Sequence, residues 1–227
     1  MTIIHQTLGQ LARDLPGATA VFHKLKLDFC CAGDQTLEEA IERKQLNSDE
    51  VVASLMALSE LTEQASTWNE AENDALIEHI LTRFHDVHRE QLPELIRLSQ
   101  RVERVHGGNP DCPVGLSAHL ESMLEELEVH MQKEETILFP MILRGMGEMA
   151  VAPVSMMRHE HEGHGDVLAG VHQLTNDITL PEGACNTWRA LYTGLAALSN
   201  DLMEHIHLEN NVLFNRIDGK LGAAKHG

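Results

Sequence analysis

Two stretches of the chain place a histidine and a glutamate four residues apart on a helix face that is otherwise apolar. They are His130 with Glu134 and His205 with Glu209. Residues four apart lie on one side of a helix, so each pair presents an imidazole beside a carboxylate. A carboxylate buried alone costs several kcal/mol, so it must be protonated, paired or bound to a cation. These faces carry no Lys or Arg, and the spacing therefore indicates a bound metal.

Both pairs interrupt long apolar seams with three- and four-residue spacing. The first seam consists of Leu116, Leu120, Met123, Leu127, His130, Glu134, Ile137 and Met141. The second seam consists of Trp188, Leu191, Leu195, Leu198, Leu202, His205, Glu209 and Val212. Both pairs follow the pattern H-x-x-x-E-x-x-[I/V]-L-F. A repeat of this length argues against chance placement on two solvated helices.

Two further helical segments also present histidines to the interior. One seam contains Leu81, His85, His88, Leu92 and Leu95, and the other contains Met157, His161, His164, Leu168 and Val171. Each H-x-x-H precedes one H-x-x-x-E motif by a similar distance, so we expect His85 and His161 to be ligands. The roles of His88 and His164 stay open between ligands and hydrogen-bond donors to ligands. His159 and His207 fall off the seams, and we expect them at the surface.

The expected donor set contains four neutral nitrogens and two carboxylates. Its members are His85, His130, Glu134, His161, His205 and Glu209. Six donors exceed the need of one ion, whereas two ions bridged by both glutamates would each take two histidines. An additional oxo or hydroxo bridge would leave a position open for a small molecule. Histidine disfavours Mg²⁺ and Ca²⁺, and the absence of thiolates disfavours structural zinc. We therefore expect two iron ions, with manganese or a mixed pair as the alternative.

The elements that must position these residues are four long helices. The periodicity predicts helical segments at about 73–106, 116–146, 154–179 and 186–216, separated by breaks that contain glycine and proline. Aromatic residues make up only 4% of the chain, which favours helices over a sandwich or barrel. We predict an all-α fold with an antiparallel four-helix bundle. Pro140 should kink the second helix or end its regular part.

A small helical domain is expected ahead of the bundle. Thr36 with Glu39 has the spacing of a capping box, and Ser48 is a candidate cap for the next helix. The predicted division is a small helical domain at 1–60, a linker at 61–72, the bundle at 73–219 and a tail at 220–227.

The predicted small domain contains two adjacent cysteines, Cys30 and Cys31, in a loop. A disulfide between neighbours closes a strained ring that is readily reduced. We interpret them as reactive thiols that handle iron or nitric oxide or contact a client protein; the alternative is two small buried apolar residues. Cys112 and Cys185 also lie in loops, and the sequence assigns them no role.

Charge and hydropathy limit the partners. The formal net charge is −18 over 227 residues, which repels phosphate backbones and anionic lipids and so makes nucleic acid and membrane poor candidates. The N-terminus lacks a basic region followed by an apolar run, and no segment has the ~20 apolar residues of a membrane span. We expect a cytoplasmic protein, either a monomer or a homodimer.

The motifs resemble those of a known group of proteins. The four histidine segments resemble the hemerythrin-like superfamily of di-iron bundles. The last helix, with His205-x-x-x-Glu209, differs from that of the oxygen carriers, and so does the third, without a histidine four residues after His161. A match over nearly the whole chain is to the YtfE/ScdA family, called repair of iron centres. The segments that carry it are Asp28–Gly33 with Thr36-Leu37, His85–Leu95, His130–Pro140 and His205–Phe214.

This resemblance implies that the six donors named above are iron ligands. It also implies repair of iron–sulfur clusters damaged by nitric oxide or oxidative stress, with iron donation as the means and damaged iron–sulfur proteins as clients. Two other functions remain open: a di-iron enzyme acting on nitric oxide, nitrite, oxygen or peroxide, and a sensor of oxygen or nitric oxide. The two-cysteine domain favours repair, and the lack of an obvious output domain disfavours the sensor.

Overall fold

A computed structural model describes residues 3–15, 17–61 and 67–217. Within these residues every regular element is a helix, apart from one bridge between Thr7 and Thr36. This confirms the all-α prediction. The chain divides into two compact units, one formed by Met1–Leu76 with Met203–Gly227 and the other by Ile77–Leu202. No described helix is both long and apolar enough to cross a membrane.

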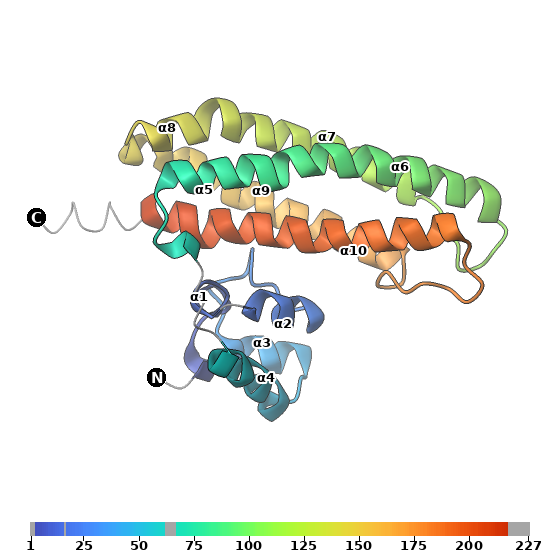
Figure 1. Cartoon of the computed structure of the whole chain (residues 1–227), viewed down its shortest axis with the longest axis horizontal. Helices are drawn as coiled ribbons and strands as arrows, with labels where there is room; N and C mark the ends of the chain where they lie inside the picture. Colours follow the sequence, from blue (N-terminus) through green and yellow to red (C-terminus); the bar gives the residue numbers. More distant parts are fainter. Residues whose placement is uncertain (1–2, 16, 62–66, 218–227) are drawn as a thin grey trace, which may run out of the picture. The chain divides into compact units, whose positions relative to one another are not determined.

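The N-terminal part consists of short helices (Figure 1). They are a 3-10 turn η1 at Ile3–His5, then α1 at Leu8–Asp14, α2 at Ala18–Lys24, α3 at Leu37–Lys44, α4 at Ser48–Leu61 and a second 3-10 turn η2 at Thr67–Asn69. Their common core is aliphatic and aromatic and is fully buried; it includes Leu8, Phe22, Leu27, Leu37 and Leu55.

Side-chain caps set where these helices begin. Thr36 and Glu39 form the predicted reciprocal capping box at the start of α3. The predicted cap at Ser48 is wrong, because Ser48 is the first residue of α4 and Asn47 does the capping. The Asn47 side chain accepts hydrogen bonds from the backbone N–H groups of Asp49 at 3.1 Å and Glu50 at 3.4 Å. Asparagine is at least as good a cap as serine, so the helix begins at Ser48, one residue earlier than a cap at Ser48 would give.

Four long helical rods form the predicted antiparallel bundle (Figure 1). The first rod is α5 at Asn73–Ile80, a π-helical turn η3 at Leu81–His85 and α6 at Asp86–His106. The second is α7 at Leu116–Lys133, a π-helical turn η4 at Glu134–Leu138 and α8 at Phe139–Leu143. The third is α9 at Gly147–Leu174. The fourth is α10 at Asn186–His207 with a π-helical turn η5 at Leu208–Leu213.

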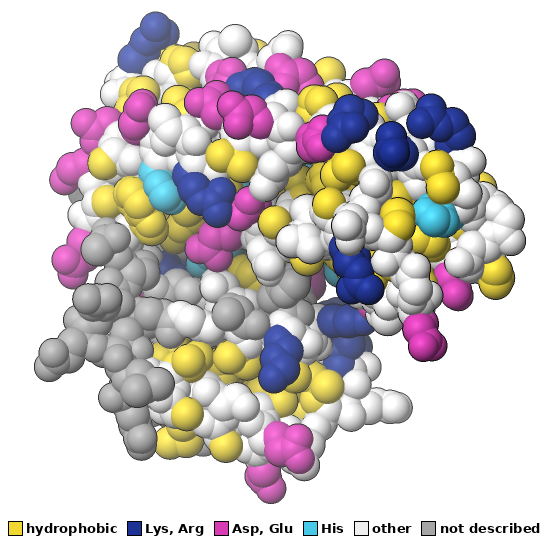
Figure 2. Space-filling model, turned by 45° about the vertical axis from the view of Figure 1, so that its right-hand side comes forward, with side chains coloured by type: hydrophobic (Ala, Val, Ile, Leu, Met, Phe, Trp, Pro, Cys, Tyr) yellow, Lys and Arg dark blue, Asp and Glu magenta, His cyan; other side chains and the backbone are white. Residues whose placement is uncertain are grey.

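Polar contacts fix the fourth rod against its neighbours. Helix α6 packs on α7, and α7 packs on α9. Asp201 of α10 accepts hydrogen bonds from Arg83 at 2.6 Å and from Gln91 at 3.0 Å. On the other side, Ser199 lies 3.1 Å from His172 of α9. Acidic side chains are interspersed with Lys, Arg and apolar groups on the face drawn in Figure 2.

The bounds predicted for the third rod were wrong at both ends. Helix α9 begins at Gly147, before Pro153, and ends at Leu174. Pro153 has no N–H, so only the carbonyl of Met149 loses its helical hydrogen bond. Met149 is 64% exposed, so water can replace that bond. The rod ends early because residues 176–178 have left-handed backbone angles, with φ of 47°, 59° and 55°.

Candidate metal centre

Four of the six predicted ligands lie in the unit formed by Ile77–Leu202, and all four are buried. His85 ends the first π-helical turn, His130 lies in the last turn of α7, and Glu134 begins the second π-helical turn. His161 lies in the middle of α9. None is more than 1% exposed.

The side chains converge on the Glu134 carboxylate. Nε2 of His85 lies 3.5 Å from Oε2 of Glu134, and Nε2 of His130 lies 3.4 Å from Oε1. Nε2 of His161 is 3.0 Å from Nε2 of His130. The three residues His130, Glu134 and His161 each offer a donor atom within 4.8 Å of the others. Three imidazole nitrogens and two carboxylate oxygens therefore face one small volume.

This donor set fits a metal ion by both distance and chemistry. Donors at about 2.1 Å from one octahedral ion lie about 3.0 Å apart when they occupy neighbouring positions. The observed separations of 3.0–3.5 Å are close to that value. Nitrogen donors combined with one carboxylate suit a first-row transition metal better than Mg²⁺ or Ca²⁺. The carboxylate has no exposed surface, so a cation there would offset its desolvation.

A second layer of carboxylates orients the histidines. Nδ1 of His85 lies 2.8 Å from Glu135, which also pairs with Arg89 at 2.9 Å. Nδ1 of His130 lies 2.9 Å from Glu160, which also pairs with Lys133 at 2.6 Å. When Nδ1 donates to a carboxylate, Nε2 is left as the nitrogen with a free lone pair, as metal binding requires.

The charge state of the two outer glutamates suits this role. Burial alone raises the pKa of Glu135 and Glu160, but the hydrogen bonds to each from a basic side chain and a histidine outweigh it. The pKa of each carboxyl therefore lies below its usual value, and both remain charged at neutral pH. Sequence reasoning missed both residues. Their sequence positions could have revealed them, because Glu135 directly follows Glu134 and Glu160 directly precedes His161.

The other two predicted ligands lie in the second unit, with the N-terminal helices. Nε2 of His205 is 3.2 Å from Oε1 of Glu209 across one turn of helix. His205 is 1% exposed and Glu209 is fully buried. Glu209 belongs to the third π-helical turn, so both glutamates of the predicted site lie on π-helical turns. Such turns in helices are frequently found at functional sites.

Of the histidines not predicted as ligands, His88 and His164 are buried and His159 is exposed. His88 is fully buried beside Phe84, with ring centroids 6.3 Å apart. His164 is buried with its ring 4.6 Å from that of His130 and almost perpendicular to it. The His159 side chain is 86% exposed, as predicted.

The prediction that His207 lies at the surface was wrong. Its exposure is 2%, and burial lowers the pKa of the imidazole to about 4. Its ring packs edge-on against Phe29 at 5.6 Å, and its Nδ1 lies 3.1 Å from the Asn211 amide. The predicted seam covers only the face of this helix toward the bundle interior. Another face packs against the N-terminal segment around Phe29.

Comparison with known proteins agrees with this architecture. Residues 76–217 match the family described as hemerythrin HHE cation binding domain, and residues 4–59 match a domain of unknown function (DUF542, ScdA_N). The iron-sulfur cluster repair protein YtfE of Pectobacterium atrosepticum is 54% identical over 93% of this chain and 96% of its own length. The YtfE protein of Yersinia pseudotuberculosis is 53% identical over the same shares.

The chain belongs to the YtfE family of iron–sulfur cluster repair proteins. Its buried histidine and glutamate clusters suit the di-iron binding expected of a hemerythrin-like domain.

The YtfE-type N-terminal segment holds the adjacent cysteines in a defined loop. The side-chain amides of Asn210 and Asn211 donate to the backbone carbonyls of Cys30 at 2.9 Å and Phe29 at 3.2 Å. These asparagines directly follow Glu209, so the cysteine loop is attached to the turn that carries a predicted ligand. Asp28 caps the loop by accepting from the Cys31 N–H at 2.9 Å.

The two thiols differ in environment. Cys30 is 6% exposed and Cys31 is half-buried, with their sulfurs 3.7 Å apart. The hydrogen bond with Cys31 raises the pKa of the Cys30 thiol well above its ordinary value, and burial raises it further. Cys30 is therefore held as a neutral thiol, and Cys31 is the more accessible of the two.

The outer carboxylates generate a prediction. Glu160→Gln keeps the shape of the side chain but removes the charge that orients His130, so metal affinity should fall by about 10- to 100-fold. The measurement is metal retained after dialysis against graded concentrations of a chelator. Glu162→Gln is the matched control, because Glu162 lies on the same helix with 68% of its side chain exposed. Equal retention by both variants would contradict the proposed orienting role.

Proposed function

We propose that this protein repairs iron–sulfur clusters damaged by nitrosative or oxidative stress and does so by donating iron. The observation that carries the proposal is the buried histidine–carboxylate cluster around Glu134, in a chain of the YtfE family. Damaged iron–sulfur proteins would be its clients, and the cytoplasm, which the sequence favours, its location.

We further propose that the iron is a pair of ions and that the ligands are those predicted from the seams: His85, His130, Glu134, His161, His205 and Glu209. The continuity of the last rod supports including its pair. No break separates α10 from η5, and the buried seam of Leu195, Leu198 and Leu202 continues directly to His205. The two glutamates would hold the ions together with the four histidines and would balance part of their positive charge, which accounts for a buried carboxylate on each of two rods.

In this proposal the protein residues hold, orient and shield the metal. Glu135 and Glu160 keep Nε2 of His85 and His130 directed inward. The surrounding Leu and Met side chains exclude bulk water, which strengthens charge interactions inside. Bound iron supplies redox activity and is also the cargo for repair. Histidine and carboxylate ligands suit release, because a thiolate-rich acceptor site competes well for iron.

The cysteine loop is a candidate transit point for that cargo. Asp28, Cys30 and Cys31 each offer a donor atom within 4.8 Å of the others. One carboxylate and two thiols make too few ligands to retain an ion firmly, which suits a brief stop. The unequal burial of the sulfurs leads us to assign first contact with iron, nitric oxide or a client to Cys31.

The proposal is tested by following iron between proteins. Iron-loaded protein labelled with ⁵⁷Fe is mixed with a cluster-depleted acceptor under anaerobic conditions, and Mössbauer spectra report where the label resides. We expect the label to move into a rebuilt cluster on the acceptor. Catalytic reduction of nitric oxide or oxygen with all label retained would instead establish the alternative, a di-iron enzyme.

A second prediction concerns the ligand at the centre of the cluster. Glu134→Ala removes both oxygens that face the histidines and leaves a polar void, so iron content should fall well below that of the parent protein. Elemental analysis of purified protein measures it. His159→Ala is the control, since that side chain is exposed and should leave iron content unchanged. Full occupancy in Glu134→Ala would refute the ligand assignment.

The role of the thiols gives a third prediction. Cys31→Ser should retain full iron content but slow transfer to the acceptor, because it alters the accessible donor without touching the bundle cluster. The time course of cluster recovery on the acceptor measures the effect. Cys112→Ser provides a control thiol in a bundle loop. Unaltered transfer by Cys31→Ser would show that the cysteine loop is not on the route.

A further inference from the structure

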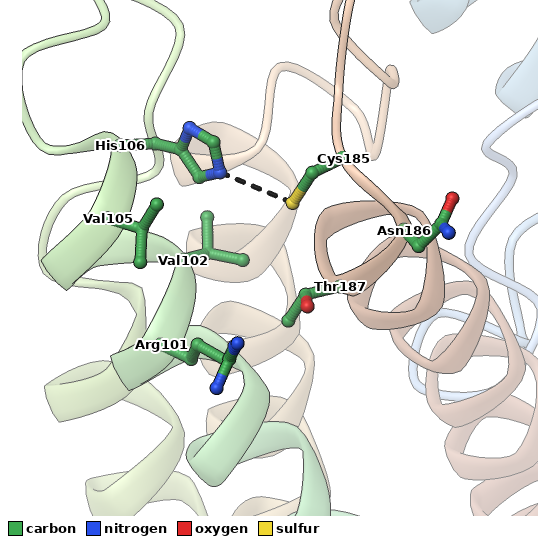
Figure 3. A pocket seen from close by; sticks show the side chains of 7 residues that line it. All are labelled: Arg101, Val102, Val105, His106, Cys185, Asn186 and Thr187. Carbon is green, nitrogen blue, oxygen red and sulfur yellow. Dashed lines mark hydrogen bonds between the residues drawn. The ribbon is translucent and has the colours of Figure 1, made fainter.

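A second thiol site lies in the bundle unit, at the end of α6 away from His85. Nε2 of His106 lies 3.2 Å from Sγ of Cys185; His106 ends α6, and Cys185 lies in the loop directly before α10 (Figure 3). Helix α6 runs from Asp86 to His106, which separates the site from His85 by about 30 Å along the axis. The iron-repair proposal does not use these residues.

Two features suit Cys185 for reaction as a nucleophile. His106 can accept the thiol proton, as in other cysteine–histidine pairs. The Cys185 carbonyl accepts from the Arg189 N–H at 3.0 Å, which places the residue at the N-terminal cap of the 22-residue helix α10. That end of a helix favours negative charge, and so it stabilises charge that builds up on the sulfur.

The pair is also held in place and accessible. The His106 ring packs on the buried Trp188 ring, with centroids 5.1 Å apart. Cys185 is half-buried rather than enclosed. Both residues line a cavity of about 360 Å³, whose other walls are Arg101, Val102, Val105, Asn186 and Thr187. A cavity of this size accepts a small organic molecule.

The residues that line the cavity indicate which class of molecule it would bind. Arg101 supplies a permanent positive charge that recognises carboxylates, and the two valines offer apolar contact. A thiol beside a base reacts with disulfides. We propose that Cys185 is a site of reversible thiol–disulfide exchange with a small disulfide that carries carboxylates, of the class of glutathione disulfide.

The reaction balances without another reagent. The Cys185 thiol gives its proton to Nε2 of His106, and the sulfur attacks one sulfur of the disulfide. A new S–S bond forms to Cys185 while the original S–S bond breaks. The departing thiolate takes the proton back from His106. The products are one mixed disulfide on the protein and one free small thiol, and a second thiol reverses the exchange.

The first test compares two cysteines within one protein. Full-length, iron-loaded protein is incubated with glutathione disulfide, and peptide mass spectrometry follows the mixed disulfide at each cysteine. We expect Cys185 to react faster than Cys112, the matched loop thiol, because burial raises the pKa of the Cys112 thiol and no described hydrogen bond joins it to a base. Equal or slower reaction at Cys185 would overturn the proposal.

Two variants test separately the role of His106 as a base and the role of the Arg101 charge. His106→Asn should slow exchange at Cys185 by roughly tenfold or more and leave the rate at Cys112 unchanged; an unaltered rate at Cys185 would overturn the role of the base.

Arg101→Gln should slow exchange with glutathione disulfide several-fold but not with uncharged hydroxyethyl disulfide. Equal effects on both reagents would overturn the preference for an acidic ligand. Far-UV circular dichroism and iron content verify that each variant is folded.

Discussion

The structure depends on balancing the negative charge of carboxylates that are buried away from water. Glu134 and Glu209 have no exposed surface, and charge without compensation at such positions would cost more than most single contacts contribute to stability. The histidines turned toward Glu134 offset part of that cost, and their own outer partners, Glu135 and Glu160, extend the compensation to Arg89 and Lys133 at the surface. A chain of alternating acidic and basic groups therefore connects the buried site to solvent.

The same constraint explains the π-helical turns. A π-helical turn adds a residue and rotates everything after it relative to a regular helix. After Glu134 the buried positions are Leu138, Phe139 and Ile142, whereas Ile137 is 53% exposed and Met141 is half-buried. The predicted seam placed Ile137 and Met141 inside, because three- and four-residue spacing assumes an uninterrupted α-helix. Pro140 lies in the first turn of α8, directly after this turn, whereas the regular part of the second rod already ends at Lys133, where the π-helical turn begins.

Much of the fold and of the candidate site follows from periodicity alone. The seam of the last rod is buried at every predicted position from Trp188 to Val212, and the predicted histidines are buried on each of the four rods. Periodicity could not predict features that depend on how neighbouring rods are aligned. The pairing of His130 with Glu160 depends on how α7 and α9 are aligned, and a residue 24% exposed resembles any surface glutamate in sequence. The end of α9 depends on backbone angles that residue preferences do not fix.

His207 shows why a seam argument fails at the end of this rod. Residues 205–214 are all buried, although a bundle helix normally keeps a polar face for water. The polar residues among them each serve a distinct partner: His205 faces Glu209, while His207, Asn210 and Asn211 contact the segment around Phe29 and Cys30. A helix buried all round must satisfy every polar group on it. One stretch therefore carries two sets of contacts, the proposed metal ligands His205 and Glu209 on one face and the anchors of the cysteine loop on another. Glu209 and Asn210 are adjacent in the chain, and the Asn210 amide donates to the Cys30 carbonyl at 2.9 Å, so the buried carboxylate and the cysteine loop are separated by one peptide unit and one hydrogen bond.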